Sequence, residues 1–529
     1  MAFAKVSLLF LACLWLAGVA AASDHYVSVN GTARGDGSIG NPWDLQTAFN
    51  PPPSVQPGDT IWIRGGVYQI ANHDGFSSKL NGTPANPIVV RNYQGERATI
   101  DGQMNAYALY VGGSYTWYWG LELMSSCTVR NTGQTYGPCA LGVGVFGPGN
   151  KFINLVVHDT TQGFDGFNAA PDTEFYGNLS YYNGFVGSDR NHGHGMYFQN
   201  SMGTKTISDN IVGDNADEGM QIYGSGTASV VNFTITGNTL YNNSSWPAGH
   251  FQYQYNLIIA GGLTRKNIKV QNNYSYFPAG ANVEGWGGSF GQYTIGEDMV
   301  VTDNVFANGV APVVFMGQSG PVTFTGNKVV AGTDALRPVT LDLWSQQNLA
   351  LYSWDRNTYY DQSPYHFYQG VTMDGSTFSG VNKLFSDWQS QTGFDAHSTY
   401  RQLAPTGVWV YVRPNKYEPK RANITIFNWD VAPAVSVDMS GVLKPGDKYD
   451  IQDAQNFYGP VVATGTYSGK AISIPMTGLT KAQPVGFPAP AHTAPQFGIF
   501  VILPLGSVAI LPDPRRISRR RSTNWQAVP

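Results

Sequence analysis

The stretch Thr206-Ile207-Ser208-Asp209-Asn210 recurs one repeat later as Thr234-Ile235-Thr236-Gly237-Asn238. Each copy places an apolar residue three positions before an Asn and a turn-forming residue directly before it. Asparagines of this kind follow one another at spacings of 24, 32, 28, 35, 31 and 23 residues, at Asn154, Asn178, Asn210, Asn238, Asn273, Asn304 and Asn327. Spacings of this size are typical of solenoid proteins. The sequence therefore predicts a coil of repeated units.

The repeats are more compatible with strands than with helices. They are rich in Val, Ile, Tyr, Phe and Thr, and Gly interrupts them often, a composition that favours short strands. When such coils stack roughly 4.8 Å apart, equivalent Asn side chains can form a hydrogen-bonded ladder and the inward apolar residues can form a continuous stack. We expect a capped coil with a long groove on one side.

Composition and the chain ends indicate an exported protein. Of the 529 residues, 42% are hydrophobic and 12% are charged, which is enough apolar material for an elongated core. Residues 1–22 contain Lys5 and then an apolar run that ends in small residues, as in a secretory signal peptide. We expect a secreted, extracellular or periplasmic protein that is a monomer. No later apolar run is as long as a membrane span.

The charge distribution argues against nucleic acid as a partner. The net charge is −4, and five of the 31 basic residues lie close together in the tail at 513–529. An isolated basic end is typical of a flexible, solvated terminus, and the acidic body would not attract a polyanion from a distance. Recognition of an acidic sugar would need particular cationic groups at the site.

Two cysteines, Cys127 and Cys139, remain after removal of the signal peptide. In an oxidising compartment we expect them to form a disulfide. The alternative is part of a metal site, although no further Cys or His lies nearby in the sequence.

The N-terminal segments have a recognisable order. They comprise His25 to Gly31, Gly40-Asn41-Pro42-Trp43, a short helix around Leu45 to Phe49, Pro57 to Tyr68, Asn86 to Arg91 and Thr99-Ile100-Asp101-Gly102. This series resembles the cap and first coils of secreted right-handed parallel β-helix proteins of the polysaccharide-lyase and pectinase-like superfamily. The resemblance extends over roughly residues 25–400. It implies an all-β right-handed parallel β-helix, a frame that carries lyases, hydrolases, epimerases and non-catalytic proteins.

From about Val408 the pattern changes to short alternating strands separated by turns, which predicts a small C-terminal antiparallel β-sandwich. The expected organisation is a signal peptide at 1–22, the β-helix with its cap at 23–400, the β-sandwich at 401–512 and a basic flexible tail at 513–529.

A second series of residues follows the form ionisable residue, glycine, large apolar residue. Its members are Asp165-Gly166-Phe167, His194-Gly195-Met196, Glu218-Gly219-Met220 and Glu284-Gly285-Trp286, with Asn256 in the place of a missing member. Equivalent positions on stacked strands repeat in space at the strand spacing. We therefore expect these titratable side chains along one exposed edge, where they could supply an acid and a base. The alternative is that each side chain simply caps a turn.

The resemblance to polysaccharide lyases implies a reaction in which the polar residues around His194 would take part. Strand alternation places Tyr197 and Gln199 on one face and Met196 and Phe198 on the other. For a lyase that cleaves a uronate by β-elimination, we expect Arg190 or calcium to neutralise the sugar carboxylate. His194 or Lys205 would then remove the proton and Tyr197 would donate one.

Calcium is the candidate cofactor because one loop carries hard oxygen ligands, Asp214, Asp217 and Glu218. Zinc at His192 and His194 would lack a third ligand. Sugar rings stack on aromatic faces, so the predicted substrate-binding residues combine aromatic and polar side chains: His192, Gln199, Tyr223, Trp246, Glu284 and Trp286.

Two other functions stay open. Gly193-His194-Gly195 is similar to the Gly-His-Gly of polygalacturonase-like glycoside hydrolases, and Asp165-Gly166 to part of their aspartate motif. In an inverting hydrolase Asp165 and Glu218 would be acid and base. A non-catalytic polysaccharide-binding or surface protein would use the same series only to cap turns. The expected partner is in each case an extracellular polysaccharide.

Overall fold

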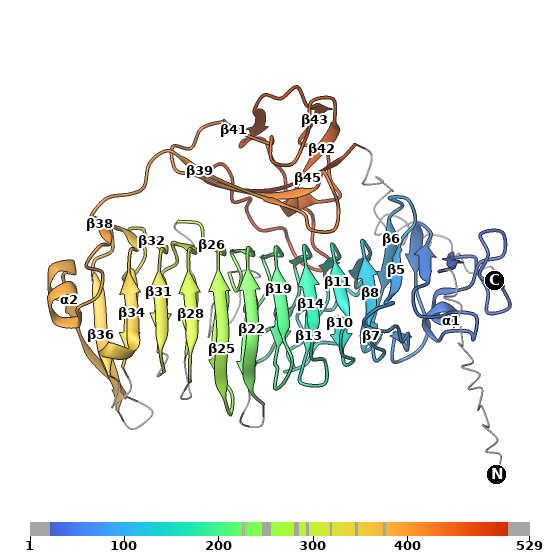
Figure 1. Ribbon diagram of the computed structural model, residues 1–529, viewed down its shortest axis with the longest axis horizontal. Helices are drawn as coiled ribbons and strands as arrows, with labels where there is room; N and C mark the ends of the chain where they lie inside the picture. Colours follow the sequence, from blue (N-terminus) through green and yellow to red (C-terminus); the bar gives the residue numbers. More distant parts are fainter. Residues whose placement is uncertain are drawn as a thin grey trace, which may run out of the picture.

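The computed structural model describes residues 22–505 apart from 225, 227, 246–254, 280–284, 292–295, 318–319, 344–347 and 374–376. Most of the predicted signal peptide and the whole basic tail therefore lie outside the described residues. Three long sheets run side by side along the molecule and form the walls of a coil, shown horizontally in Figure 1. The architecture is the right-handed parallel β-helix that the sequence predicts.

Each sheet contains twelve strands within the described part of the chain. The first sheet is built from β1 (Asp24–Val27), β2 (Thr60–Ile63), β5 (Ile88–Asn92), β8 (Thr116–Trp119), β11 (Lys151–Ile153), β14 (Thr173–Tyr176), β19 (Lys205–Ser208), β22 (Val230–Thr236), β25 (Arg265–Gln271), β28 (Met299–Thr302), β31 (Val322–Thr325) and β34 (Tyr352–Asp355). The second sheet is built from β4 (Phe76–Ser78), β7 (Tyr107–Val111), β10 (Leu141–Val145), β13 (Phe164–Gly166), β18 (Met196–Phe198), β21 (Met220–Gly224), β24 (Leu257–Gly261), β27 (Gly288–Phe290), β30 (Val314–Met316), β33 (Val339–Asp342), β36 (Phe367–Met373) and β37 (Thr377–Lys383).

The third sheet completes each turn of the coil. It is built from β3 (Gly66–Tyr68), β6 (Ala98–Asp101), β9 (Glu122–Met124), β12 (Val156–His158), β15 (Leu179–Tyr181), β20 (Ile211–Gly213), β23 (Thr239–Tyr241), β26 (Tyr274–Tyr276), β29 (Val305–Ala307), β32 (Lys328–Ala331), β35 (Thr358–Asp361) and β38 (Thr399–Arg401). Helix α1 (Leu45–Phe49) lies at the N-terminal end and helix α2 (Phe385–Thr392) at the other end, where it buries Trp388. A 3-10 turn, η2 (Leu349–Leu351), precedes β34.

The predicted Asn ladder is present at the corner between the first and third sheets. Nδ2 of Asn178 donates to Oδ1 of Asn210 at 2.8 Å, and the same contact repeats through Asn238, Asn273, Asn304 and Asn327 at 2.9 to 3.0 Å. The ladder then continues to Asn357, which the spacing analysis did not include. Each Asn side chain also forms hydrogen bonds with backbone groups of the neighbouring coils, so the buried polar groups at this corner have partners.

Asn154 was wrongly placed in the ladder. Ile153 pairs with Tyr176, so Asn154 lies opposite Gly177, and the backbone N–H of Leu155 instead donates to Asn178. Asn154 occupies the left-handed region at φ 53°, which Asn tolerates better than most residues. Its side chain contacts the C-terminal domain through Asn415.

The inside of the coil is apolar. The residues three before each ladder Asn, such as Ile207, Ile235 and Val270, are fully buried. Tyr118, Phe152 and Phe175 stack on one another, with ring centroids 5.4 and 5.1 Å apart. These stacks repeat the strand spacing and stabilise the coil along its length.

The C-terminal domain contains two antiparallel sheets. Five strands form one sheet, and two form the other: β39 (Val408–Pro414), β40 (Ala422–Asn428), β45 (Phe497–Pro504), β42 (Lys448–Asp453) and β43 (Ala463–Thr466), then β41 (Ala434–Val437) and β44 (Ile472–Pro475). The 3-10 turn η3 (Ala454–Asn456) follows β42. The facing sheets share a core that includes Ile424, Val437 and Ile474.

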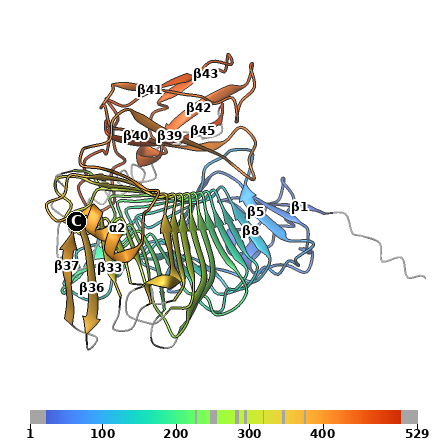
Figure 2. The same cartoon turned by 60° about the vertical axis from the view of Figure 1, so that its left-hand side comes forward.

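The other face of the five-stranded sheet packs on the coil. Phe427, Phe497 and Ile499 form one hydrophobic cluster with Tyr241 and Tyr276 of the third sheet. Figures 1 and 2 show this domain lying along one side of the coil. It therefore covers the third sheet and leaves the outer face of the second sheet open.

The cysteines form the predicted disulfide, Cys127–Cys139. Among the described residues, the helices are short, and none has the length and hydrophobicity needed to cross a bilayer.

Candidate active site

Strand register brings His194 and Glu218 together on the second sheet. Met196 of β18 pairs with Met220 of β21, so the residues two positions earlier, His194 and Glu218, occupy equivalent places on adjacent rungs. Nδ1 of His194 lies 2.7 Å from Oε2 of Glu218. Both residues are largely buried, at 7% and 4% exposure. This part of the predicted series is therefore a close histidine–carboxylate pair just before two adjacent strands, and it is an ion pair whenever His194 is protonated.

Asp217 and Arg190 complete a cluster with this pair. Nη1 of Arg190 contacts Oδ2 of Asp217. One donor atom from each of His194, Asp217 and Glu218 lies within 4.8 Å of the other two. We call these four residues the His194 cluster.

The two carboxyl groups of the cluster titrate in opposite directions. Burial and then the charge of Glu218 raise the pKa of Asp217 well above its usual range, although Arg190 opposes the change. Burial would also raise the pKa of Glu218, but the charge and hydrogen bonding of His194 outweigh it and lower the pKa to about 2. The raised pKa of Asp217 favours its protonated form and the lowered pKa of Glu218 favours its ionised form, and the charges of both carboxyl groups stabilise the nearby Arg190 guanidinium.

Asp165 does not stand in register with His194. Phe164 of β13 pairs with Met196, so Asp165 lies opposite Tyr197 and the equivalent of His194 is Gln162. The predicted alignment of Asp165 with His194 is therefore wrong. The register of the strands is set by the inward apolar residues Phe164 and Met196, and the sequence pattern of ionisable residue, glycine and apolar residue does not distinguish inward from outward positions. Asp165 still lies on the outer face of the same sheet, and burial raises its pKa to about 7.

The outward face of β18 carries the polar residues that alternation predicts. Met196 and Phe198 are fully buried, whereas Tyr197 and Gln199 are partly exposed. The Tyr197 ring meets the His194 ring edge to face, with centroids 5.4 Å apart. Burial raises the pKa of Tyr197, so its hydroxyl keeps its proton. Nε2 of Gln199 donates to this hydroxyl at 3.4 Å.

An open cavity of about 600 Å³ adjoins the cluster. Among its lining residues, Arg190, His192, His194 and His73 are basic, and none is Asp or Glu. Four further lining residues are not among the predicted site residues. They are the aromatic residues Tyr107, Tyr136 and Phe185, and Gln162, whose side-chain amide donates to Asp165. Gln162 could have been found, because it precedes an inward Phe by two positions as His194 precedes Met196.

His192 lies on a short hairpin at the edge of this cavity. The hairpin consists of β16 (Phe185–Val186) and β17 (Asn191–His192). The His192 ring stacks on Phe185 with centroids 5.0 Å apart, and its Nε2 lies 2.8 Å from Asp189. It therefore lines the cavity at a distance from the ion pair rather than sharing a metal with His194.

The aromatic residues continue the same row beyond Glu218. Tyr255 and Trp286 are bridged to each other and occupy the positions equivalent to Glu218 on the next two rungs. With partly buried Tyr223 they pack around Ile258 and Ala260 on the outer face of the sheet. Tyr223 and Trp286 thus belong to one cluster, which also contains Tyr255, a residue outside the predicted substrate-binding set. Trp246 and Glu284 lie outside the described residues.

Lys205 does not reach the site, and its prediction as a base is wrong. It lies on β19 of the first sheet, and its side chain crosses the interior of the coil with no exposed surface. Its Nζ donates to the backbone carbonyls of Gly166 and Phe167 at 3.0 and 3.2 Å. Burial lowers its pKa to about 7.

Asp214 also lies elsewhere, so the predicted set of calcium ligands is not assembled. Its carboxylate pairs with Lys481 of the C-terminal domain, on the covered side of the coil. The remaining donors are two carboxylates and an imidazole, and Arg190 already contacts one of the carboxylates. Calcium prefers six to eight oxygen ligands, so these residues do not fit it.

Two family models match the chain. Residues 25–256 match the model described as Pel9A-like, right handed beta helix region, and residues 188–353 match the right handed beta helix region model. Both models describe a right-handed β-helix, in agreement with the three parallel sheets of the coil. No curated protein matches this β-helix protein significantly.

Several solved structures are similar to this chain at low identity and low TM-score. Pectate lyase Pel9A is 16% identical with a TM-score of 0.41, over 74% of this chain and 91% of that one. An alginate lyase from Paenibacillus sp. str. FPU-7 is 16% identical with a TM-score of 0.39, over 66% and 99%. The GH136 lacto-N-biosidase from Eubacterium ramulus is 14% identical with a TM-score of 0.41, over 59% and 64%.

Proposed function

We propose that the protein is a secreted polysaccharide lyase that cleaves a uronate-containing polysaccharide by β-elimination. The observation that carries the proposal is the cavity beside His194, in which an arginine and three histidines are present and no carboxylate is among the lining residues. Each of these basic groups has a carboxylate partner outside the lining residues, so the cavity presents the basic member of every pair to a ligand. This arrangement supports an anionic ligand. The apolar N-terminal segment supports export.

The cluster supplies the groups that the reaction needs. Because Nδ1 of His194 faces Glu218, its Nε2 is the ring nitrogen available to substrate. Arg190 lines the same cavity and stays cationic: burial lowers its pKa, but the charges of Asp217 and Glu218 outweigh burial and raise it. Tyr197 holds a protonated hydroxyl next to His194.

In the proposed reaction, Arg190 binds the uronate carboxylate and so acidifies the proton at C5. Nε2 of His194 takes this proton, and the electron pair of the C5–H bond forms the C4–C5 double bond. The C4–O bond breaks, and the departing glycosidic oxygen receives the proton of the Tyr197 hydroxyl. Glu218 orients the imidazole and stabilises its cationic form, as the carboxylate of a catalytic triad does.

A glycoside hydrolase is the second candidate because two buried carboxyl groups titrate far apart. The pKa of Asp165 is about 7 and that of Glu218 about 2, a separation typical of acid and base pairs. Glu218 is however engaged by His194, which leaves it a weaker base than the hydrolase mechanism requires. A purely binding protein is the third candidate.

The test is incubation with pectate, alginate and glycosaminoglycans while ultraviolet absorbance and reducing ends are both recorded. A lyase produces an unsaturated uronate, so absorbance and reducing ends rise together. Reducing ends without absorbance would establish the hydrolase, and neither signal on the whole panel would leave the binding role. The matched control is His397→Gln, which changes an exposed histidine paired with Asp355 at the far end of the coil.

A further inference from the structure

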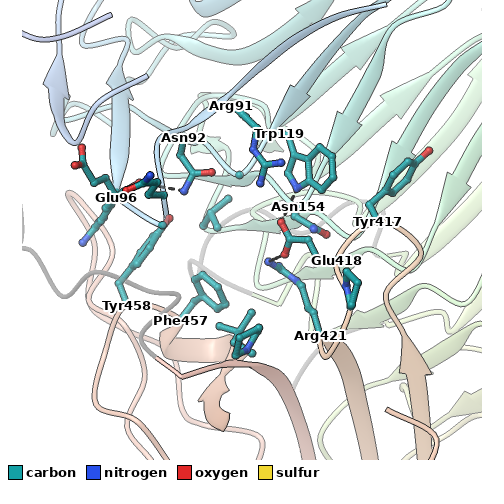
Figure 3. Close-up of a pocket in the computed structure, with 18 residues that line it drawn as sticks. Arg91, Asn92, Glu96, Trp119, Asn154, Tyr417, Glu418, Arg421, Phe457 and Tyr458 are labelled. Carbon is teal, nitrogen blue, oxygen red and sulfur yellow. Dashed lines mark hydrogen bonds and ion pairs between the residues drawn. The ribbon is translucent and has the colours of Figure 1, made fainter. Parts of the chain in front are cut away.

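A second cavity lies between the coil and the C-terminal domain, apart from the His194 cluster. It has a volume of about 470 Å³ and is shown in Figure 3. The coil contributes the corners after β5 and β8, with Arg91, Glu96 and Trp119. The C-terminal domain contributes the β39–β40 turn, with Glu418 and Arg421, and Tyr458 after η3.

The charged residues of this cavity leave a positive excess. Glu96 pairs with Arg64, Glu418 pairs with Arg421, and Arg97 pairs with Glu122. Arg91 has no ion pair within the part of the chain that the structure describes; its guanidinium instead stacks on Trp119, 4.2 Å from the ring centroid. The cavity therefore carries one uncompensated cation.

Two arginines from opposite domains also have unsatisfied donors. Nε of Arg91 is buried without a hydrogen-bond partner, and so are Nε and Nη2 of Arg421. The Arg421 side chain is only 7% exposed. Buried guanidinium nitrogens without acceptors are costly, and a carboxylate is the acceptor whose geometry matches a guanidinium. In Figure 3 both side chains extend toward the same space.

The remaining walls suit a sugar rather than a small inorganic anion. Trp119, Tyr417, Phe457 and Tyr458 provide aromatic surface, and Asn92 and Gln94 provide amide groups for hydroxyls. The cavity is much larger than one carboxylate needs. Sugar rings combine an apolar face with hydroxyl groups, which is the combination that such walls recognise.

We propose that this interdomain cavity is a non-catalytic binding site for an acidic sugar, with the uronate carboxylate held between Arg91 and Arg421. The site would bind one part of a polysaccharide chain at a place separate from the His194 cluster. The choice of a uronate rests on the proposed function, whereas a binding site for carboxylated sugars at this place does not depend on catalysis.

The experiment is calorimetric titration of the full chain with galacturonic acid and glucuronic acid, against galactose, acetate and inorganic phosphate. It uses a background that carries both His194→Gln and Arg190→Gln, so that neither turnover nor uronate binding in the other cavity contributes, and failure of the proposed catalysis leaves the measurement intact. We expect saturable uronate binding that weakens at least about tenfold in Arg91→Gln, in line with the loss of a charge-assisted contact. Arg91→Lys should restore part of it.

The control is His397→Gln, which changes an exposed histidine outside both cavities and should leave this binding unchanged. Thermal denaturation checks that Arg91→Gln folds normally. Uronate binding that is equal in the wild-type and Arg91→Gln proteins would overturn the proposal. Binding of acetate or phosphate as strong as that of uronate would also overturn it, because the site would then recognise any anion.

Discussion

Oε2 of Glu218 lies 2.7 Å from Nδ1 of His194, on adjacent rungs of the open sheet. The two residues are 24 positions apart in the sequence, and strand pairing alone makes them neighbours. The contact fixes which ring nitrogen faces the cavity, and the proposed reaction depends on this orientation.

Replacing His194 should remove most of the activity. We expect His194→Gln to lower kcat by about 100-fold or more, because general base catalysis contributes about 10² to 10⁴. Glu218→Gln should lower kcat less, since it leaves the base and removes only its orienting charge. Rates on the active polysaccharide check both variants, with His397→Gln as the control. Full activity of His194→Gln would rule out the histidine as the base.

Asp165→Asn distinguishes the lyase from the hydrolase. In the lyase proposal Asp165 does not touch the reacting atoms, so unsaturated product should still form at a rate within a few fold of wild type. In the hydrolase alternative Asp165 is the acid, and the variant would lose its activity. Product analysis decides between the two outcomes.

The stability of the same variant should depend on pH. The folded-state pKa of Asp165 is raised from 3.8 to about 7 by burial, so between these values the folded protein binds a proton that the unfolded chain does not. Stability from this group is present below pH about 4 and is lost as the pH rises through about 7. We expect the Tm of Asp165→Asn relative to wild type to increase from pH 4 to 7 and then level off. A difference that stays constant with pH would contradict the raised pKa.

Lys205→Met should stabilise the coil, most strongly at and below neutral pH. Burial lowers the pKa of Lys205 from 10.5 to about 7, so between these values the unfolded chain binds a proton that the folded protein lacks. Wild-type stability therefore rises with pH across this window, and the advantage of Met should shrink from pH 7 toward pH 10. Thermal denaturation at several pH values measures it. An advantage that grows with pH would contradict the prediction.

Chelation should not abolish the activity. Asp214 pairs with Lys481 on the covered side of the coil, and Arg190 contacts Asp217, so we expect the reaction to proceed without calcium. Initial rates in EDTA, with and without added calcium, test this. A rate that disappears in EDTA and returns with calcium would show that the cluster binds the ion.

An Asn in the ladder should matter more than the Asn just outside it. Asn178→Ala leaves the N–H of Leu155 and the carbonyl of Phe152 without partners, at about 1 to 3 kcal/mol for each buried group. Asn154→Gly should change the free energy of unfolding by only about 1 kcal/mol, because the equivalent positions hold Gly177 and Gly237 in the same left-handed conformation. Denaturant unfolding compares the two variants.

Much of the fold was predictable from local features. Each coil needs an Asn to hydrogen-bond with buried backbone groups at its corner, and an apolar residue three positions earlier to fill its interior. These two residue types therefore recur together in the sequence, where their spacing can be recognised. The disulfide followed from the compartment and the count of cysteines. The polarity of the two faces of β18 followed from strand alternation at Met196 and Tyr197.

The grouping of the active-site residues was decided only by the tertiary structure. Loops of different length separate the strands of successive coils, so the similar triplets at Asp165 and His194 do not occupy equivalent positions. The pairing of the apolar residues Phe164 and Met196 sets the register instead. Lys205 and Asp214 are close to the site in sequence, yet one points into the coil and the other toward the C-terminal domain. The sequence determined which residues recur, because a coil repeats its local requirements. The direction of each polar side chain depended on strand pairing and on which sheet the C-terminal domain covers, and these are contacts between distant parts of the chain.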